Sequence, residues 1–245
     1  IACSGDPDGP MVRKLGGAVL GIKWDTQTDK FSIKLPVNIT KRRRGMVTGP
    51  DLTKETLESM EGAVFTRRIL LSVTMSLYDP LGFITPVSLR MKWLLQQLGK
   101  NKAAGWDDPM CQEERPRWTE IIQQLVEQGE LVFSRSCKPV NVDSEAVVTL
   151  ITYLDGSDTA KAFVAYIRYI LLTGKPHVSL LAAKAKLNPS AGQSTPRSEM
   201  DGQTLGARGA KTISEASKDV TPPIMRIYML GDSRTLPRNQ KRRHF

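Results

Sequence analysis

Residues 153–169 read YLDGSDTAKAFVAYIRY, in which an Asp-Gly-Ser turn lies between two runs rich in β-branched and aromatic residues. Aspartate, glycine and serine are common turn residues, so the segment predicts a β-hairpin. On its own such a turn is structural. Asp155 would have a chemical role only if further acidic residues, each at the edge of its own strand or helix, lie close to it.

More strands and one helix surround this hairpin in the sequence. The runs at 146–154, 160–172 and 178–187 are joined by short turns and predict a three-stranded antiparallel sheet. Residues 196–217 begin Pro-Arg-Ser-Glu and predict a helix, because proline is favoured in a first turn. Residues 224–230 predict a fourth strand. The expected fold class is α/β (α+β overall), with a mixed sheet and a helix packed on it.

The N-terminal half has a different pattern. Residues 18–35 alternate apolar and polar side chains on both sides of a turn and predict a hairpin, whereas 52–128 carry apolar residues at helical spacing and predict three or four helices. We therefore expect a hairpin and basic linker at residues 1–50, a helical segment at 51–138 and the sheet domain at 139–245. Asp79-Pro80 is expected to separate the first two helices.

Composition excludes several kinds of chemistry. The chain has 245 residues and only two histidines. This number disfavours zinc sites and catalysis that uses a histidine with serine or cysteine. Its three cysteines are too few for a disulfide framework, which favours a reducing, intracellular and cytoplasmic location. No apolar run approaches the roughly 18 residues of a membrane span, so we expect no membrane partner. A first residue of Ile1 in place of methionine suggests a piece of a longer polypeptide.

Basic residues are concentrated in two segments of this chain of net charge +10. The first is Lys41, Arg42, Arg43 and Arg44, and the second is the C-terminal tail, which includes Arg234. Such clusters are either solvated loops or contacts for the phosphates of a nucleic acid.

Three acidic residues stand at the edges of separate elements. Asp155 ends the first strand of the C-terminal half, Glu199 lies in the first turn of the expected helix, and Asp232 ends the fourth strand. If the first and fourth strands are neighbours, their terminal aspartates are neighbours too, and a helix crossing the sheet could bring Glu199 over them. Three converging carboxylates repel one another unless divalent cations neutralise them, and oxygen ligands suit Mg²⁺ or Mn²⁺.

Several motifs resemble one family in the same order along the chain. They are LGIKWDTQTDKFSIK, LLSVTMSLYDPLGFITPVSLRMKWLLQQL, YLDGSDTAKAFVAYIRY, VSLLAAKAKLNP, TPRSEMDGQTLGAR and LGDSRT. Over residues 15–236 the sequence resembles the Pol polyprotein of BEL/Pao-type LTR retrotransposons, from the end of the reverse transcriptase into an RNase H-like domain. The stretch SLYDPLGFITPV is the most specific part.

This resemblance implies a function. Asp155, Glu199 and Asp232 would be the catalytic and metal-binding carboxylates of an RNase H-type nuclease that uses two Mg²⁺ or Mn²⁺ ions to cut the RNA strand of an RNA–DNA hybrid. The partners would be the hybrid and the remainder of the Pol polyprotein. Hybrid recognition would rest on backbone contacts and shape, with the two basic segments contributing.

The sequence departs from the family pattern in several places. Asp201 and Gly202 replace apolar residues after Glu199, where glycine costs a helix about 1 kcal/mol and a charge faces the sheet. Phe163 replaces a small residue and is expected to crowd the core. Pro237 interrupts a further helix, and a fourth carboxylate has no counterpart, so we expect a fragment with impaired activity.

Two other functions stay open. The name Pao retrotransposon peptidase, given to this part of the family, implies an aspartic peptidase. Retroviral-type peptidases need Asp-Thr-Gly or Asp-Ser-Gly. The nearest strings here are Asp155-Gly156-Ser157 and Asp158-Thr159-Ala160. The chain could instead be a non-catalytic connection segment that binds nucleic acid through its basic residues.

Overall fold

The computed structural model describes residues 21–40, 49–60, 63–100, 104–140, 142, 145–172, 174–220 and 222–232. It divides into two compact units, one formed by Ile1–Asp79 with Arg90–Arg135 and the other by Pro80–Leu89 with Ser136–Phe245. The segment boundaries that the sequence suggests at residues 50 and 138 stay predictions. No helix in the described ranges combines the length and the apolar character that crossing a membrane requires.

The first unit contains a small antiparallel sheet. The sequence-predicted hairpin is formed by β1 (Ile22–Asp25) and β2 (Lys30–Lys34), and β3 (Glu130–Ser134) adds to β2. We did not expect β3 as a strand from the sequence. Its register places Phe133 opposite Phe31, where the two rings meet edge to face with centroids 6.0 Å apart. This aromatic pair stabilises a strand pairing between segments about 100 residues apart in sequence.

Helices make up the rest of the first unit, as the apolar spacing predicts. They are the 3₁₀ helix η2 (Lys54–Met60), α1 (Arg67–Ser76), α2 (Thr85–Lys100), whose first five residues belong to the second unit, and α3 (Arg115–Gln128). Thr66 caps α1 by accepting a hydrogen bond from the Ile69 N–H at 3.3 Å. Gly129 ends α3 with a φ of 61°, a conformation that glycine adopts without strain. Leu77 to Ile84 separate α1 from α2, which agrees with the break expected at Asp79-Pro80.

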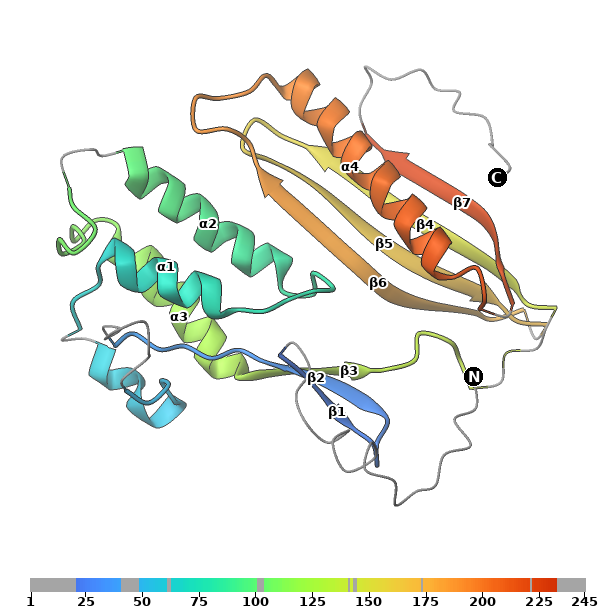
Figure 1. Ribbon diagram of the computed structural model, residues 1–245, viewed down its shortest axis with the longest axis horizontal. Helices are drawn as coiled ribbons and strands as arrows, with labels where there is room; N and C mark the ends of the chain where they lie inside the picture. Colours follow the sequence, from blue (N-terminus) through green and yellow to red (C-terminus); the bar gives the residue numbers. More distant parts are fainter. Residues whose placement is uncertain are drawn as a thin grey trace. The chain divides into compact units, whose positions relative to one another are not determined.

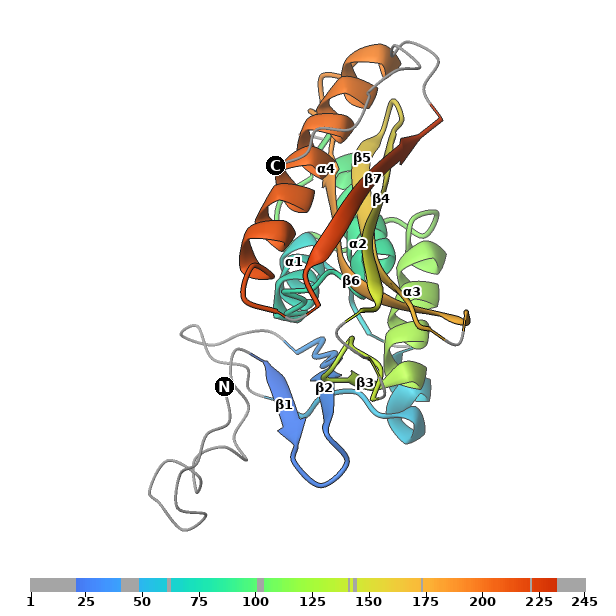
Figure 2. The same ribbon diagram turned by 90° about the vertical axis from the view of Figure 1, so that its right-hand side faces the viewer.

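The second unit is a four-stranded mixed sheet with one helix across it (Figures 1 and 2). The strands β4 (Val147–Gly156), β5 (Ala160–Ile170) and β6 (Pro176–Leu187) form the expected antiparallel meander. The strand β7 (Ile224–Gly231) pairs with β4 in parallel, so the order is β6-β5-β4-β7. The helix α4 (Thr195–Ala216) supplies the crossover between β6 and β7 and covers one face. The expected mixed sheet with a packed helix, and the α+β fold class, are confirmed.

The core of the second unit lies between this sheet and α4. Its buried members are Leu150, Leu154, Phe163, Ala165 and Ala210. Phe163, which the sequence suggested would crowd the core, faces glycines on the helix. A Cβ added to Gly209 would lie 2.4 Å from the Phe163 ring, so the missing side chain makes room for the larger aromatic one.

The segment between α1 and α2 also contributes to the second unit. The Leu81 carbonyl accepts a hydrogen bond from the Ala183 N–H at 2.8 Å, on the outer edge of β6. Gly82 has a φ of +82°, and a Cβ there would lie 1.8 Å from the Ala183 carbonyl oxygen. The Asp-Pro-Leu-Gly turn therefore covers part of a strand edge that would otherwise present unpaired backbone groups.

Candidate carboxylate site at the end of the sheet

Two of the three candidate carboxylates lie at the same end of neighbouring strands. The parallel register pairs Tyr153 with Leu230 and Leu154 with Gly231. The residues that come next are Asp155 after Leu154 and Asp232 after Gly231. Adjacent strands are about 4.8 Å apart, and residues in register share a face of the sheet. Both aspartates are exposed. The strand adjacency on which the sequence argument depended is therefore present.

The third carboxylate, Glu199, is carried by the start of α4. The helix begins at Thr195, one residue earlier than the sequence suggested, so Glu199 lies just beyond the first turn and is half-buried. A Cβ added to Gly156 at the end of β4 would lie 2.5 Å from the Ser198 carbonyl carbon and 2.6 Å from the Glu199 nitrogen. The backbone next to Asp155 and the backbone of Glu199 are thus in direct contact.

The side chains themselves do not form a closed metal site in this arrangement. Across the residues that the structure describes, no three acidic, histidine or cysteine side chains come close enough together to hold a metal ion. The Asp155 Oδ1 accepts a hydrogen bond from the Gly156 N–H at 2.7 Å. The oxygen donors are of the type that Mg²⁺ and Mn²⁺ prefer. The structure brings the three elements together, and the metal-ligand role of their carboxylates stays a prediction.

A buried pair of polar side chains, which the sequence analysis did not identify, joins the hairpin turn to α4. Asn188 and Ser198 are 3% and 0% exposed. The Asn188 Nδ2 donates to the Ser157 carbonyl oxygen at 2.8 Å and to the Ser198 Oγ at 3.0 Å, while the Ser198 hydroxyl is 3.4 Å from the Ala160 carbonyl oxygen. Buried polar groups with complete hydrogen bonding fix one local geometry. This Asn188–Ser198 pair therefore fixes the turn after Asp155 against the residue before Glu199.

The two positions that the sequence suggested would weaken α4 have compensating contacts. Asp201 forms an ion pair with Lys161 at 2.5 Å and accepts a hydrogen bond from the Gln193 Nε2 at 3.0 Å. The hydrogen bonds from Lys161 and Gln193 lower the pKa of Asp201 below its usual value. Gly202 is buried against β4, because a Cβ there would lie 2.6 Å from the Asp155 carbonyl oxygen. The expected cost of glycine to the helix stays a prediction, and the structure adds that glycine allows the close approach of helix and strand.

The basic residues proposed to bind nucleic acid, Lys41, Arg42, Arg43, Arg44 and Arg234, lie outside the described residues. Their role therefore stays a prediction.

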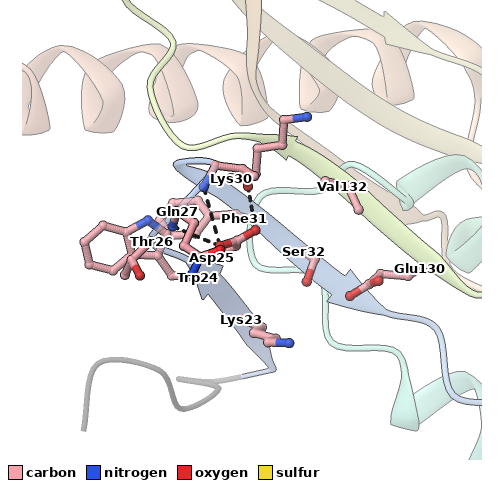
Figure 3. A pocket seen from close by; sticks show the side chains of 11 residues that line it. Lys23, Trp24, Asp25, Thr26, Gln27, Lys30, Phe31, Ser32, Glu130 and Val132 are labelled. Atoms are coloured by element: carbon pink, nitrogen blue, oxygen red, sulfur yellow. Dashed lines mark hydrogen bonds between the residues drawn. The ribbon is translucent and has the colours of Figure 1, made fainter. Parts of the chain in front are cut away.

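A cavity of about 460 Å³ in the first unit is lined by residues of β1, β2, β3 and the turn between β1 and β2, and none of them is a candidate carboxylate (Figure 3). Asp25, one of its two acidic residues, has a local structural role. The Asp25 carboxylate accepts hydrogen bonds from the Gln27 N–H at 3.0 Å and the Thr28 hydroxyl at 2.6 Å, and these bonds lower its pKa. This is the arrangement of an Asx-type turn, so Asp25 stabilises the hairpin.

Comparisons with known proteins identify a family. A family model described as the Pao retrotransposon-like RNaseH-like domain matches residues 66–233. A search of the curated proteins gave no match. One similar solved structure is a foamy viral protease–reverse transcriptase in complex with double-stranded DNA, with 14% sequence identity and a TM-score of 0.34 over 76% of this chain and 36% of that chain. The chain thus spans about a third of that structure's chain. The family match confirms the resemblance to BEL/Pao-type retrotransposon Pol.

Proposed function

The chain belongs to the Pao retrotransposon-like RNaseH-like domain family, and on this basis we propose that it hydrolyses the RNA strand of an RNA–DNA hybrid. One observation supports this most: β4 and β7 pair in parallel, with Asp155 as the second-last residue of β4 and Asp232 directly after β7, and Gly156 contacts the start of the helix that carries Glu199. Asp155, Glu199 and Asp232 would be the reacting carboxylates.

These carboxylates would hold Mg²⁺ or Mn²⁺. When bound, two such ions activate a water and stabilise the leaving oxygen in phosphodiester hydrolysis. In the reaction a water oxygen bonds to phosphorus, the bond from phosphorus to the 3′ oxygen breaks, and the products are a 5′-phosphate and a 3′-hydroxyl. The protein would supply oxygen ligands at fixed positions and would not need histidine.

The residues around the carboxylates would act by positioning them. The Gly156 N–H orients the Asp155 carboxylate through a 2.7 Å hydrogen bond, and the Asn188–Ser198 pair holds the following turn on α4. Reacting groups held on a rigid sheet and helix lose less entropy in reaching the geometry of catalysis.

The test is cleavage of a hybrid with end-labelled RNA by the full chain in Mg²⁺ or Mn²⁺. We expect RNA fragments that carry 5′-phosphate ends, and a loss of more than about 100-fold in Asp155→Asn, since even partners of metal ligands contribute 10–100-fold. Asp158→Asn, an exposed aspartate in the same turn, is the matched control and should cut like the original chain.

If the original chain binds the hybrid but does not cut it in either ion, the catalytic proposal is wrong and a purely nucleic-acid-binding role is supported. Equal cleavage by Asp155→Asn would also refute the assigned site.

A further inference from the structure

The sheet of the second unit has a second face, opposite α4, and the proposed catalytic function uses only the end of this face that carries Asp155 and Asp232. Side chains of β5, β4 and β7 lie on it in register, in successive cross-strand rows. From one end these rows are Arg168/Thr149/Arg226, Tyr166/Ile151/Tyr228 and Val164/Tyr153/Leu230, and we call this set the aromatic face. The next row is Ala162/Asp155, beside Asp232.

The aromatic face is open over β4 and β7. Tyr153 is 49% exposed, Tyr228 39% and Leu230 43%. Tyr153 and Tyr166 meet edge to face with ring centroids 6.1 Å apart. Several large apolar or aromatic side chains exposed together on one face are typical of a binding surface.

Two arginines lie at one end of this face. Arg168 and Arg226 flank Thr149, which is buried between their strands, and two strand spacings separate their Cα atoms by about 9.6 Å. Neither makes an ion pair within the described part of the chain. The Arg168 Nε is buried without a hydrogen-bond partner, which is costly for a guanidinium donor. Within the described residues the Arg168 Nε–H therefore lacks an acceptor, and a bound anion would bring acceptor oxygens to this row.

We propose that the aromatic face binds a single strand of nucleic acid, with Arg168 and Arg226 contacting one backbone phosphate and Tyr228 and Tyr153 stacking on bases. Guanidinium groups bind phosphate oxygens in pairs, and aromatic rings stack on any base. Three row spacings of about 6.7 Å separate the arginines from Asp155, so the track is about 20 Å long.

Nucleic acid is favoured over a protein partner by charge. The face presents two cationic groups and hydroxyl-bearing rings, and the chain carries a net charge of +10. The direction of the nucleic-acid strand towards the carboxylates rests on the proposed function. Binding of nucleic acid to the aromatic face does not.

The test is fluorescence anisotropy of a labelled eight-nucleotide oligo(dT) with the full chain in EDTA, where metal-dependent cleavage does not occur. We expect Arg226→Gln to weaken binding about 5–10-fold and to lower the slope of log K against log[salt] by about 0.7, the value for one phosphate contact on a single strand. Tyr228→Ala should weaken binding about 5–100-fold, the range for one lost base stack.

Arg208→Gln is the matched control, because Arg208 is exposed on α4 and the charge change is the same. It should bind within about two-fold of the original chain. Far-UV circular dichroism and thermal melting of all variants verify that they fold.

Equal binding by Arg226→Gln, Tyr228→Ala and Arg208→Gln would overturn the proposal. Sedimentation in the same buffer identifies another occupant: if Tyr228→Ala abolishes self-association but leaves oligonucleotide binding unchanged, the face binds a second copy of the chain. The oligonucleotide assay in EDTA and the hybrid-cleavage assay with Mg²⁺ or Mn²⁺ are independent measurements. If the chain binds the oligonucleotide but does not cut a hybrid, only the proposed function is refuted. If the chain cuts a hybrid but its oligonucleotide affinity is unchanged by Arg226→Gln and Tyr228→Ala, only this inference is refuted.

Discussion

Gly202→Ala tests the close approach between α4 and β4, because local and tertiary effects have opposite signs there. Alanine is favoured over glycine inside a helix by about 1 kcal/mol, so helix propensity alone predicts stabilisation. In the structure the new Cβ would lie 2.6 Å from the Asp155 carbonyl oxygen and 3.2 Å from its carbon. These are backbone atoms of a paired strand and cannot rotate away, so the helix or the strand has to move.

The size of the effect follows from the difference between these two terms. Overpacking of this kind costs about 1–3 kcal/mol, and a clash with backbone belongs in the upper part of that range. After subtracting the gain in helix propensity, we expect Gly202→Ala to lower the free energy of unfolding by about 1–2 kcal/mol. For a chain of this size the melting temperature would fall by about 2–8 °C.

Gly99→Ala is the matched control. Gly99 is exposed near the end of α2 and has no atom within 4 Å of an added Cβ, so alanine should stabilise by up to about 1 kcal/mol. The assay is thermal unfolding followed by far-UV circular dichroism and by tryptophan fluorescence. All four tryptophans lie in the first unit, so tryptophan fluorescence reports the unfolding of that unit and the effect of Gly99→Ala. Gly202 lies in the second unit, so the effect of Gly202→Ala is read from any separate transition that circular dichroism detects. A rise in melting temperature for Gly202→Ala would refute the close approach.

Two further substitutions test the contacts around the carboxylates. Asn188→Ala removes the buried donor to Ser157 and Ser198 and should lower the free energy of unfolding by about 2 kcal/mol. In the double variant with Ser198→Ala the combined loss should be smaller than the sum of the two single losses. Additive losses in thermal melts would show that the two side chains act separately. Because Lys161 and Gln193 lower the pKa of Asp201, its stabilising contribution is present above the usual aspartate pKa of about 3.9 and is lost as pH falls through the lower folded value. Asp201→Asn should therefore melt below the original chain at pH 7 and together with it near pH 2, and a difference that is constant over this pH range would contradict the assigned cause.

The sequence predicted the elements that depend on local patterns. The alternation around Asp155 predicted β4 and β5, and the Pro196 start predicted α4 to within one residue. β3 was missed because its five residues directly follow α3 and are stabilised by β2, a partner distant in sequence. The hydrophobic pattern of so short a segment does not separate a strand from a helix end.

The candidate site was only partly predictable for a related reason. Family motifs identified Asp155, Glu199 and Asp232, and strand adjacency then placed two of them at one edge. The contact of Gly202 with β4 was not predicted because helix propensity is local, whereas this contact depends on a strand distant in sequence. The motif VSLLAAKAKLNP includes Asn188 but gives it no role, since an asparagine before a proline is typical of a turn until its burial is known.

The departures from the family pattern bear on activity through chemistry more than through folding. Phe163 fits against Gly209, and the charge of Asp201 is neutralised by Lys161, so each change has a compensating partner in the same chain. Glu199 is held beside Gly156 by backbone contact that neither change disturbs. If the hybrid is not cut although the melting behaviour of Gly202→Ala and Asn188→Ala agrees with the structure, the cause would lie in the ligand set of the carboxylate site. The helix that carries Glu199 would then be in place, and loss of the fold could not explain the loss of cleavage.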